Sequence, residues 1–259
     1  MPSKKIYIIL FIMLLTFGIV MFIFYGIPNI REENIEGTFI VGDNTTWVLR
    51  EKNWSFLRYT SSMDSYSWQT FHVFEDNNYK GDYYLWHDDK WYVFDEKKEA
   101  INLSGRLFAY NSNVDLKVFD FQESKIDDYS FVYEVLNENG ISSSSQFTSS
   151  YKVSLDFDGD SIEEDFYIIS NALPIDFEPE TTFSIAFMVK NNVIYPLYTD
   201  VSSNKGLNGC KPFYHTFVDT NYDGVSEVIL SCGKFSATDQ VDMLFQFYDE
   251  RFNLLISNQ

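Results

Sequence analysis

Two short acidic segments have the residue types and spacing of cation-binding loops. In residues 219–227, side chains with carboxylate or amide oxygens alternate along the chain, and Gly224 permits a tight turn. Hard cations such as Ca²⁺ take about six to eight oxygen ligands from carboxylates, amides, backbone carbonyls and water. The segment therefore predicts a Ca²⁺ site. Its expected ligands are Asp219, Asn221, Asp223, the carbonyl of Val225, and Glu227.

The same pattern occurs once more, 63 residues earlier, in residues 156–164. An apolar segment typical of a β-strand follows each copy, at 166–169 and at 228–231. The expected ligands of this copy are Asp156, Asp158, Asp160, the carbonyl of Ile162, and Glu164, with Asp165 as an alternative last ligand. The alternative interpretation is a pair of solvated turns, since Asp, Asn and Gly also favour ordinary turns.

These loops differ from an EF-hand, which needs a glutamate at its twelfth position. That position is Tyr167 in one copy and Leu230 in the other. The spacing and the following strands resemble the calcium loops of FG-GAP and VCBS-type repeats, as found in integrin α-chain propellers. The resemblance covers residues 151–257, without the FG and GAP residues themselves. It implies bound Ca²⁺ and blade-like units of four antiparallel strands.

Each unit within 151–259 is expected to contain a strand, the acidic loop, a second strand, a variable loop and a strand pair. The later pairs are predicted at 182–190 with 193–198, and at 241–248 with 252–256. Two units cannot close a propeller. Either the first half of the chain adds metal-free blades, or the two units pack face to face as a small sandwich. We favour the sandwich, since the first half shows no matching repeat.

The first half of the chain is rich in aromatic and β-branched residues in short runs separated by polar turns. Nine strands are expected, the last at 130–135. They predict an aromatic-rich all-β domain over 29–136, built as a meander that closes as a barrel or rolls as a sandwich. The serine-rich segment 137–150 is expected to be a linker to a calcium-loop domain at 151–259.

The N-terminus carries an uncharged apolar run, residues 6–27, preceded by Lys4 and Lys5 and ended by Pro28. The run is long enough for a transmembrane helix. The lysines indicate a cytoplasmic N-terminus, so residues 1–28 are expected to be a short cytoplasmic segment and a signal-anchor. The rest of the chain would then be extracytoplasmic at the cell membrane. The alternative is secretion after cleavage of a signal peptide.

The chain has 38 acidic and 19 basic residues, a formal net charge of −19. This charge argues against nucleic acid as a partner and suits a protein that meets divalent cations. Cys210 and Cys232 are the two cysteines, and outside the cytoplasm an even pair predicts a disulfide. Free buried thiols are the alternative.

No nucleophile motif, phosphate-binding glycine loop or zinc spacing is present in the sequence. We therefore expect no enzyme but a membrane-anchored, calcium-stabilised binding or structural module whose partner is a protein or glycan at the cell surface. All five tryptophans lie between 47 and 91, either as a recognition surface or, as we favour, as core. An accessory subunit of a membrane complex is the first alternative. An exported glycan-acting enzyme is the second, because paired carboxylates cannot be recognised from the sequence alone.

Overall fold

The structure, a computed structural model, describes most of the chain from residue 35 onward, and Glu36–Gln259 form one compact unit. The described residues are 35–50, 53–57, 66–112, 116–119, 121, 123–172, 181–202, 211–221, 223–233 and 240–258. Within them, no helix combines the length and the apolar composition that crossing a membrane requires. The predicted transmembrane segment, residues 6–27, lies outside the described residues.

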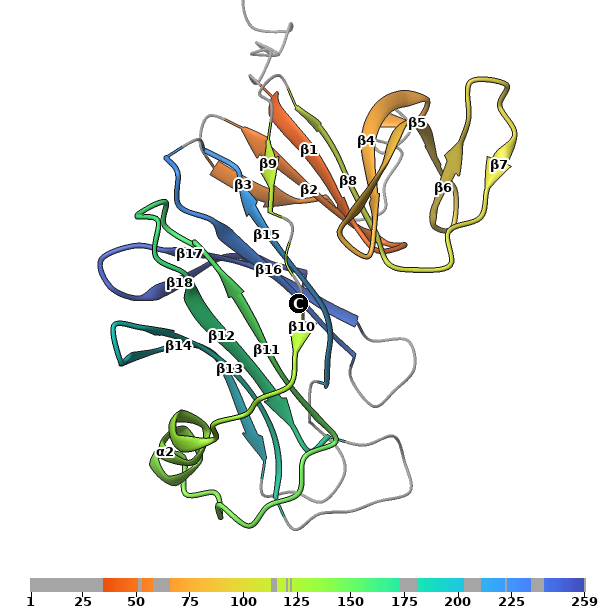
Figure 1. Ribbon diagram of the computed structural model, residues 1–259. Helices are drawn as coiled ribbons and strands as arrows, with labels where there is room; N and C mark the ends of the chain where they lie inside the picture. The colour runs from red at the N-terminus through yellow and green to blue at the C-terminus, as the bar shows by residue number, and fades with distance from the viewer. Residues whose placement is uncertain are drawn as a thin grey trace, which may run out of the picture. The chain divides into compact units, whose positions relative to one another are not determined.

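The described chain folds mostly as β-structure, in three antiparallel sheets with one short helix, which confirms the expected all-β class (Figure 1). The first sheet has the strand order β3-β2-β1-β8-β4-β5-β6-β7 and is open, so the expected barrel is wrong. The expected meander is also interrupted, since β8 inserts between β1 and β4. The strands are β1 (Ile35–Val41), β2 (Thr45–Arg50), β3 (Asn53–Phe56), β4 (Gln69–Glu75), β5 (Asn78–His87), β6 (Trp91–Phe94), β7 (Ala100–Ile101) and β8 (Leu107–Ser112).

The two predicted repeat units each supply four consecutive strands to a sheet of their own. The sheet of the first repeat has the order β10-β11-β12-β13-β14, and the sheet of the second repeat has the order β18-β17-β16-β15-β9. The repeat strands are β11 (Ser149–Leu155), β12 (Glu164–Ser170), β13 (Thr182–Lys190), β14 (Val193–Ser202), β15 (Lys211–Asp219), β16 (Glu227–Gly233), β17 (Gln240–Phe247) and β18 (Phe252–Ser257).

The fifth strand of each repeat sheet comes from the segment before the repeats. β9 (Lys117–Val118) pairs with β15, and β10 (Glu123–Ser124) pairs with β11. The segment expected to end the first domain thus supplies strands to both repeat sheets.

The repeat sheets pack face to face, as the favoured sandwich requires. Alternate residues of a strand point to opposite faces, and one apolar cluster unites inward-facing side chains of both sheets, including Phe166, Met188, Phe217 and Leu230. The outer face of the second repeat sheet packs on the first sheet of the chain through a separate cluster. Because it is covered on both sides, β16 is buried along nearly its whole length.

The outer face of the first repeat sheet is covered by helix α2 (Ser130–Glu138). Its first residues were expected to form a strand, and that expectation is wrong. The buried residues Val132, Val135 and Leu136 have the spacing of one helical face and pack on β12 and β13. Ile141, in the segment expected to be a linker, is buried in the same cluster.

Candidate metal centre

The two acidic segments occupy equivalent connections in the two repeats. Loop 1 (residues 156–164) joins β11 to β12, and loop 2 (residues 219–227) joins β15 to β16. The β13–β14 and β17–β18 turns lie at the same end of the sandwich, on the left of Figure 1. Both predicted sites therefore lie at this end of the sandwich.

The loops share a backbone conformation held by the same three side-chain contacts. In loop 1, Asp156 accepts a hydrogen bond from the N–H of Ser161, Asp160 from that of Ile162, and Glu164 from that of Phe157, at 3.1, 2.8 and 2.9 Å.

In loop 2, the residues 63 positions later repeat this set: Asp219 accepts from Gly224, Asp223 from Val225, and Glu227 from Thr220, at 3.1, 2.8 and 2.8 Å. Ser161 and Gly224 both adopt a positive φ, 68° and 85°. The repeat seen in the sequence is therefore also a repeat of local structure.

The two loops touch each other. The Ser226 N–H donates a hydrogen bond to the Phe157 carbonyl at 2.8 Å. A Cβ placed on Gly159 would lie 3.2 Å from the Gly224 carbonyl oxygen, so a side chain there would crowd the contact. The loops form one paired structure, here called the loop pair.

Loop 1 brings three of its predicted ligands close together. One carboxylate oxygen from each of Asp156, Asp158 and Glu164 lies within 4.8 Å of the others, a spacing at which these oxygens could share a cation. Oε1 of Glu164 belongs to a fully buried side chain and accepts no hydrogen bond. A buried carboxylate oxygen without a donor needs a positive charge nearby. This donor set fits a hard cation.

Among the described residues, the ammonium of Lys190, at the end of β13, forms ion pairs with loop 1. Its Nζ pairs with Asp158, lies 2.9 Å from Asp160 Oδ2 and 3.4 Å from Glu164 Oε1. Burial opposes the charge of Lys190, but hydrogen bonds to Asp158 and Asp160 outweigh it and raise the lysine pKa. The same ammonium lowers the pKa of Asp160. Burial raises the pKa of Glu164, opposed by the Phe157 N–H and by Lys190.

Loop 2 is arranged differently around its carboxylates. Within the described residues its acidic groups do not converge as those of loop 1 do. Asn221 and Asp223 are exposed and hydrogen-bond each other at 3.0 Å. Glu227 is buried and accepts hydrogen bonds from the Thr220 hydroxyl and, at 3.4 Å, from the Gln246 amide. Burial raises the pKa of Glu227 to about 7, and the charges of Asp223 and Asp219 add to the rise.

The carbonyl ligands predicted at Ile162 and Val225 stay predictions, since the contacts of these residues involve their N–H groups. Lys190 was not among the expected site residues. Its role depends on which residue of β13 lies opposite Glu164, and the variable loop between β12 and β13 hides that register from the sequence.

The predicted disulfide falls partly outside the described residues. Cys232, at the end of β16, is disulfide-bonded and fully buried. Cys210 lies outside the described part of the chain.

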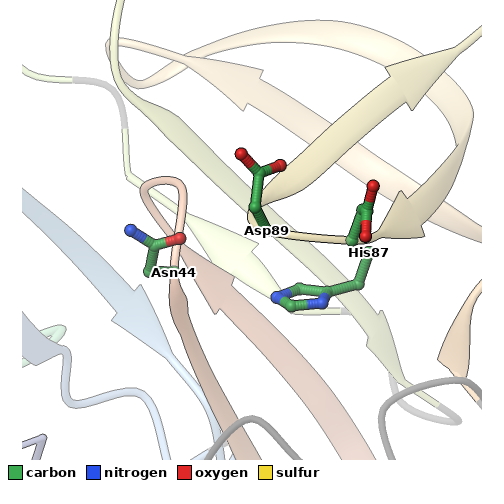
Figure 2. A pocket seen from close by; sticks show the side chains of 4 residues that line it. Asn44, His87 and Asp89 are labelled. Atoms are coloured by element: carbon green, nitrogen blue, oxygen red, sulfur yellow. The ribbon is translucent and has the colours of Figure 1, made fainter.

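Away from the loops, a pocket of about 390 Å³ with polar and charged lining residues lies in the first sheet, between the β1–β2 and β5–β6 turns. Figure 2 shows Asn44, His87 and Asp89 around it, and Asp88 completes the lining. The Tyr92 hydroxyl donates a hydrogen bond to Asp89 at 2.8 Å and lowers its pKa. Carboxylate, amide and imidazole groups thus border one opening.

Comparison with known proteins found no match among family models, curated proteins or solved structures.

Proposed function

We propose that this protein is a membrane-anchored, extracytoplasmic binding module whose loop pair is stabilised by Ca²⁺. The observation that carries the proposal is the repeated loop structure, in which a buried glutamate and two further aspartates are held in the same way twice. The likeness to FG-GAP and VCBS loops supports Ca²⁺ as the ion. No catalytic role is assigned to the loops.

The proposed role of the ion is structural. Burying carboxylates is costly unless a cation compensates them. Ion binding at such a site is therefore coupled to folding. Extracellular calcium modules work at dissociation constants of about 10⁻⁴–10⁻³ M, so an exported protein can depend on the ion. The apolar run 6–27 supports membrane anchoring, with secretion after cleavage as the alternative.

Thermal unfolding of the full chain in mild detergent tests the ion requirement. We expect 2 mM Ca²⁺ to raise Tm by about 5 °C relative to chelator, from the affinity range and the size of the chain. Asp223→Ala should reduce that shift. Equal Tm values with Ca²⁺ and with chelator in the unmodified chain would reject Ca²⁺ stabilisation.

The proposed partner is a protein or glycan. The pocket of Asn44, His87, Asp88 and Asp89 supports a polar ligand, since its groups can donate to and accept from hydroxyls. Binding of a glycan array by the chain, and its loss in Asn44→Ala, would test this surface. A protein partner would instead leave the array blank and appear in cross-linking on intact cells.

A glycan-acting enzyme is the second candidate, because two carboxylates, Asp88 and Asp89, border the same pocket. A glycosidase needs one carboxyl with a raised pKa as general acid. The Tyr92 hydrogen bond lowers the pKa of Asp89, so Asp89 is suited to the base or nucleophile role rather than the acid role. Hydrolysis of a polysaccharide panel that disappears in Asp89→Asn would favour the enzyme over the binding module.

A further inference from the structure

Lys190 and Gln246 hold the same place in the two repeats. In the second repeat, Glu227 of β16 is paired with Gln246 of β17. In the first, β12 and β13 pair Asp165 with Val189, so the next residues toward the loop are Glu164 and Lys190. The polar nitrogen of each side chain lies 3.4 Å from Oε1 of its glutamate. One repeat therefore has an ammonium where the other has an amide.

The surroundings of the Lys190 ammonium resemble those of a bound cation. It contacts three carboxylates that come from three positions of the acidic pattern, Asp158, Asp160 and Glu164. Its side chain is 17% exposed and that of Glu164 is fully buried. Oε1 of Glu164 has no hydrogen-bond donor, so the ammonium supplies its positive charge. The carboxylates of loop 1 converge and, within the described residues, those of loop 2 do not, which agrees with an ammonium beside loop 1 and an amide beside loop 2.

We propose that Lys190 is the resident cation of loop 1, placed where a divalent ion would bind, and that Gln246 leaves loop 2 dependent on an added ion. The second half of this inference rests on the proposed function, whereas the first half concerns Lys190 alone. A second cation entering loop 1 would meet the charge of the ammonium at close range, which weakens its binding.

A reciprocal exchange in the full chain tests the inference: Lys190→Gln makes loop 1 like loop 2, and Gln246→Lys makes loop 2 like loop 1. Calorimetric titration with Ca²⁺ gives the number of ions bound, and thermal unfolding with Ca²⁺ or chelator shows how far Tm depends on Ca²⁺. We expect Lys190→Gln to bind one Ca²⁺ more than the unmodified chain, and its Tm to drop in chelator and recover with Ca²⁺. Gln246→Lys should lose a Ca²⁺ site and unfold at a higher Tm in chelator.

Lys152→Gln is the matched control. Lys152 also bridges a carboxylate, Asp165 at 3.1 Å, but on the strands beside loop 1 rather than within it. Lys152→Gln should leave the number of bound Ca²⁺ ions unchanged. The inference is overturned if Lys190→Gln behaves in the same way, with no extra ion and a Tm that drops equally with Ca²⁺ and with chelator.

The outcomes separate this inference from the proposed function. If the unmodified chain binds no Ca²⁺ but Lys190→Gln gains a site, the calcium proposal fails and the role of Lys190 stands. If Lys190→Gln does not fold, the Tm of Gln246→Lys in chelator, compared with that of the unmodified chain, tests the inference instead. A rise there supports an ammonium as a substitute for the ion, and an unchanged or lower Tm rejects it.

Discussion

The side chain opposite the buried glutamate is a lysine in loop 1 and a glutamine in loop 2. Three backbone N–H groups donate to equivalent carboxylates in both loops. Loop 1 also has an aspartate, Asp158, where loop 2 has Asn221, so the loop with the ammonium has the extra carboxylate. The shared acidic spacing thus accompanies shared hydrogen bonds within the loops, and we propose that one residue on the neighbouring strand determines which cation neutralises each loop.

The largest difference between the loops is expected at their second position, Phe157 against Thr220. Phe157 is fully buried among aromatic rings, including Phe166 at 5.0 Å between ring centroids. Phe157→Ala should lower the free energy of unfolding by about 3–5 kcal/mol, as in other large-to-small core changes. Thr220→Val, which removes the hydroxyl donor to Glu227, should cost about 2 kcal/mol. Urea denaturation measures both, and equal losses would contradict the burial of Phe157 in the core.

The strands that enter the loops also differ, since β15 carries His215 where β11 carries Lys152. His215 is stacked against Phe121 and Tyr151, at 4.8 and 5.5 Å, and burial lowers its pKa to about 4. The Glu123 carboxylate lies 3.9 Å from Nε2 of His215.

Because the unfolded chain binds a proton near pH 6.5 and the folded chain does not, stability due to His215 is complete above pH 6.5. It should fall by about 3 kcal/mol as the pH drops to 4.

Glu227, with its raised pKa, stabilises the folded chain as the pH falls, which opposes the effect of His215. The informative quantity is therefore the difference in the free energy of unfolding between the unmodified chain and His215→Phe. The variant should become more stable relative to the unmodified chain as the pH drops from 6.5 to 4, measured by denaturant titrations at matched salt. A constant difference across this range would mean that His215 is protonated as readily when folded as when unfolded.

A smaller effect is expected where the loops touch, at Gly159 and Gly224. Both have a positive φ, which costs about 1–2 kcal/mol for a residue with a side chain. Only a Cβ on Gly159 also meets the partner loop, at 3.2 Å from the Gly224 carbonyl oxygen. Gly159→Ala should therefore destabilise by about 1 kcal/mol more than Gly224→Ala. Gly140→Ala, with a positive φ and open space around it, is the control for strain alone. Gly224→Ala should match this control and Gly159→Ala should exceed both, measured by urea denaturation, and equal losses in all three would contradict the contact between the loops.

The smallest effect concerns the third position of the loops, where half-buried Asp158 in loop 1 corresponds to exposed Asn221 in loop 2. Asn221→Asp adds a carboxylate to loop 2 and should strengthen Ca²⁺ binding by a few-fold, since ligand charge tunes such sites. Asp158→Asn removes one partner of the Lys190 ammonium and should leave Ca²⁺ affinity unchanged. Titration calorimetry measures both, and weaker binding in Asp158→Asn would place the ion in loop 1.

Much of the repeat region could be predicted from the sequence, because its signals are local. The acidic spacing and the strands that follow it were recognisable, and β13 spans the predicted residues 182–190. Helix α2 was missed because Phe131, Val132 and Tyr133 are typical of strands, while its helical burial depends on packing against β12 and β13.

Long-range pairings could not be predicted. The insertion of β8 between β1 and β4 and the pairing of β9 and β10 with the repeats join residues far apart in the chain. No turn between them fixes their register. The position of Lys190 opposite Glu164 could not be predicted for the same reason, because it depends on the register of β12 and β13. Only the structure shows the residue that distinguishes the loops.

The number of Ca²⁺ ions bound by the unmodified full chain, measured by titration calorimetry beside Asp223→Ala, tests the proposed difference between the loops most directly. We expect one ion per chain, absent in Asp223→Ala, since loop 1 already holds the ammonium of Lys190. Two ions per chain would contradict the difference between the loops, and none would contradict the metal requirement of loop 2.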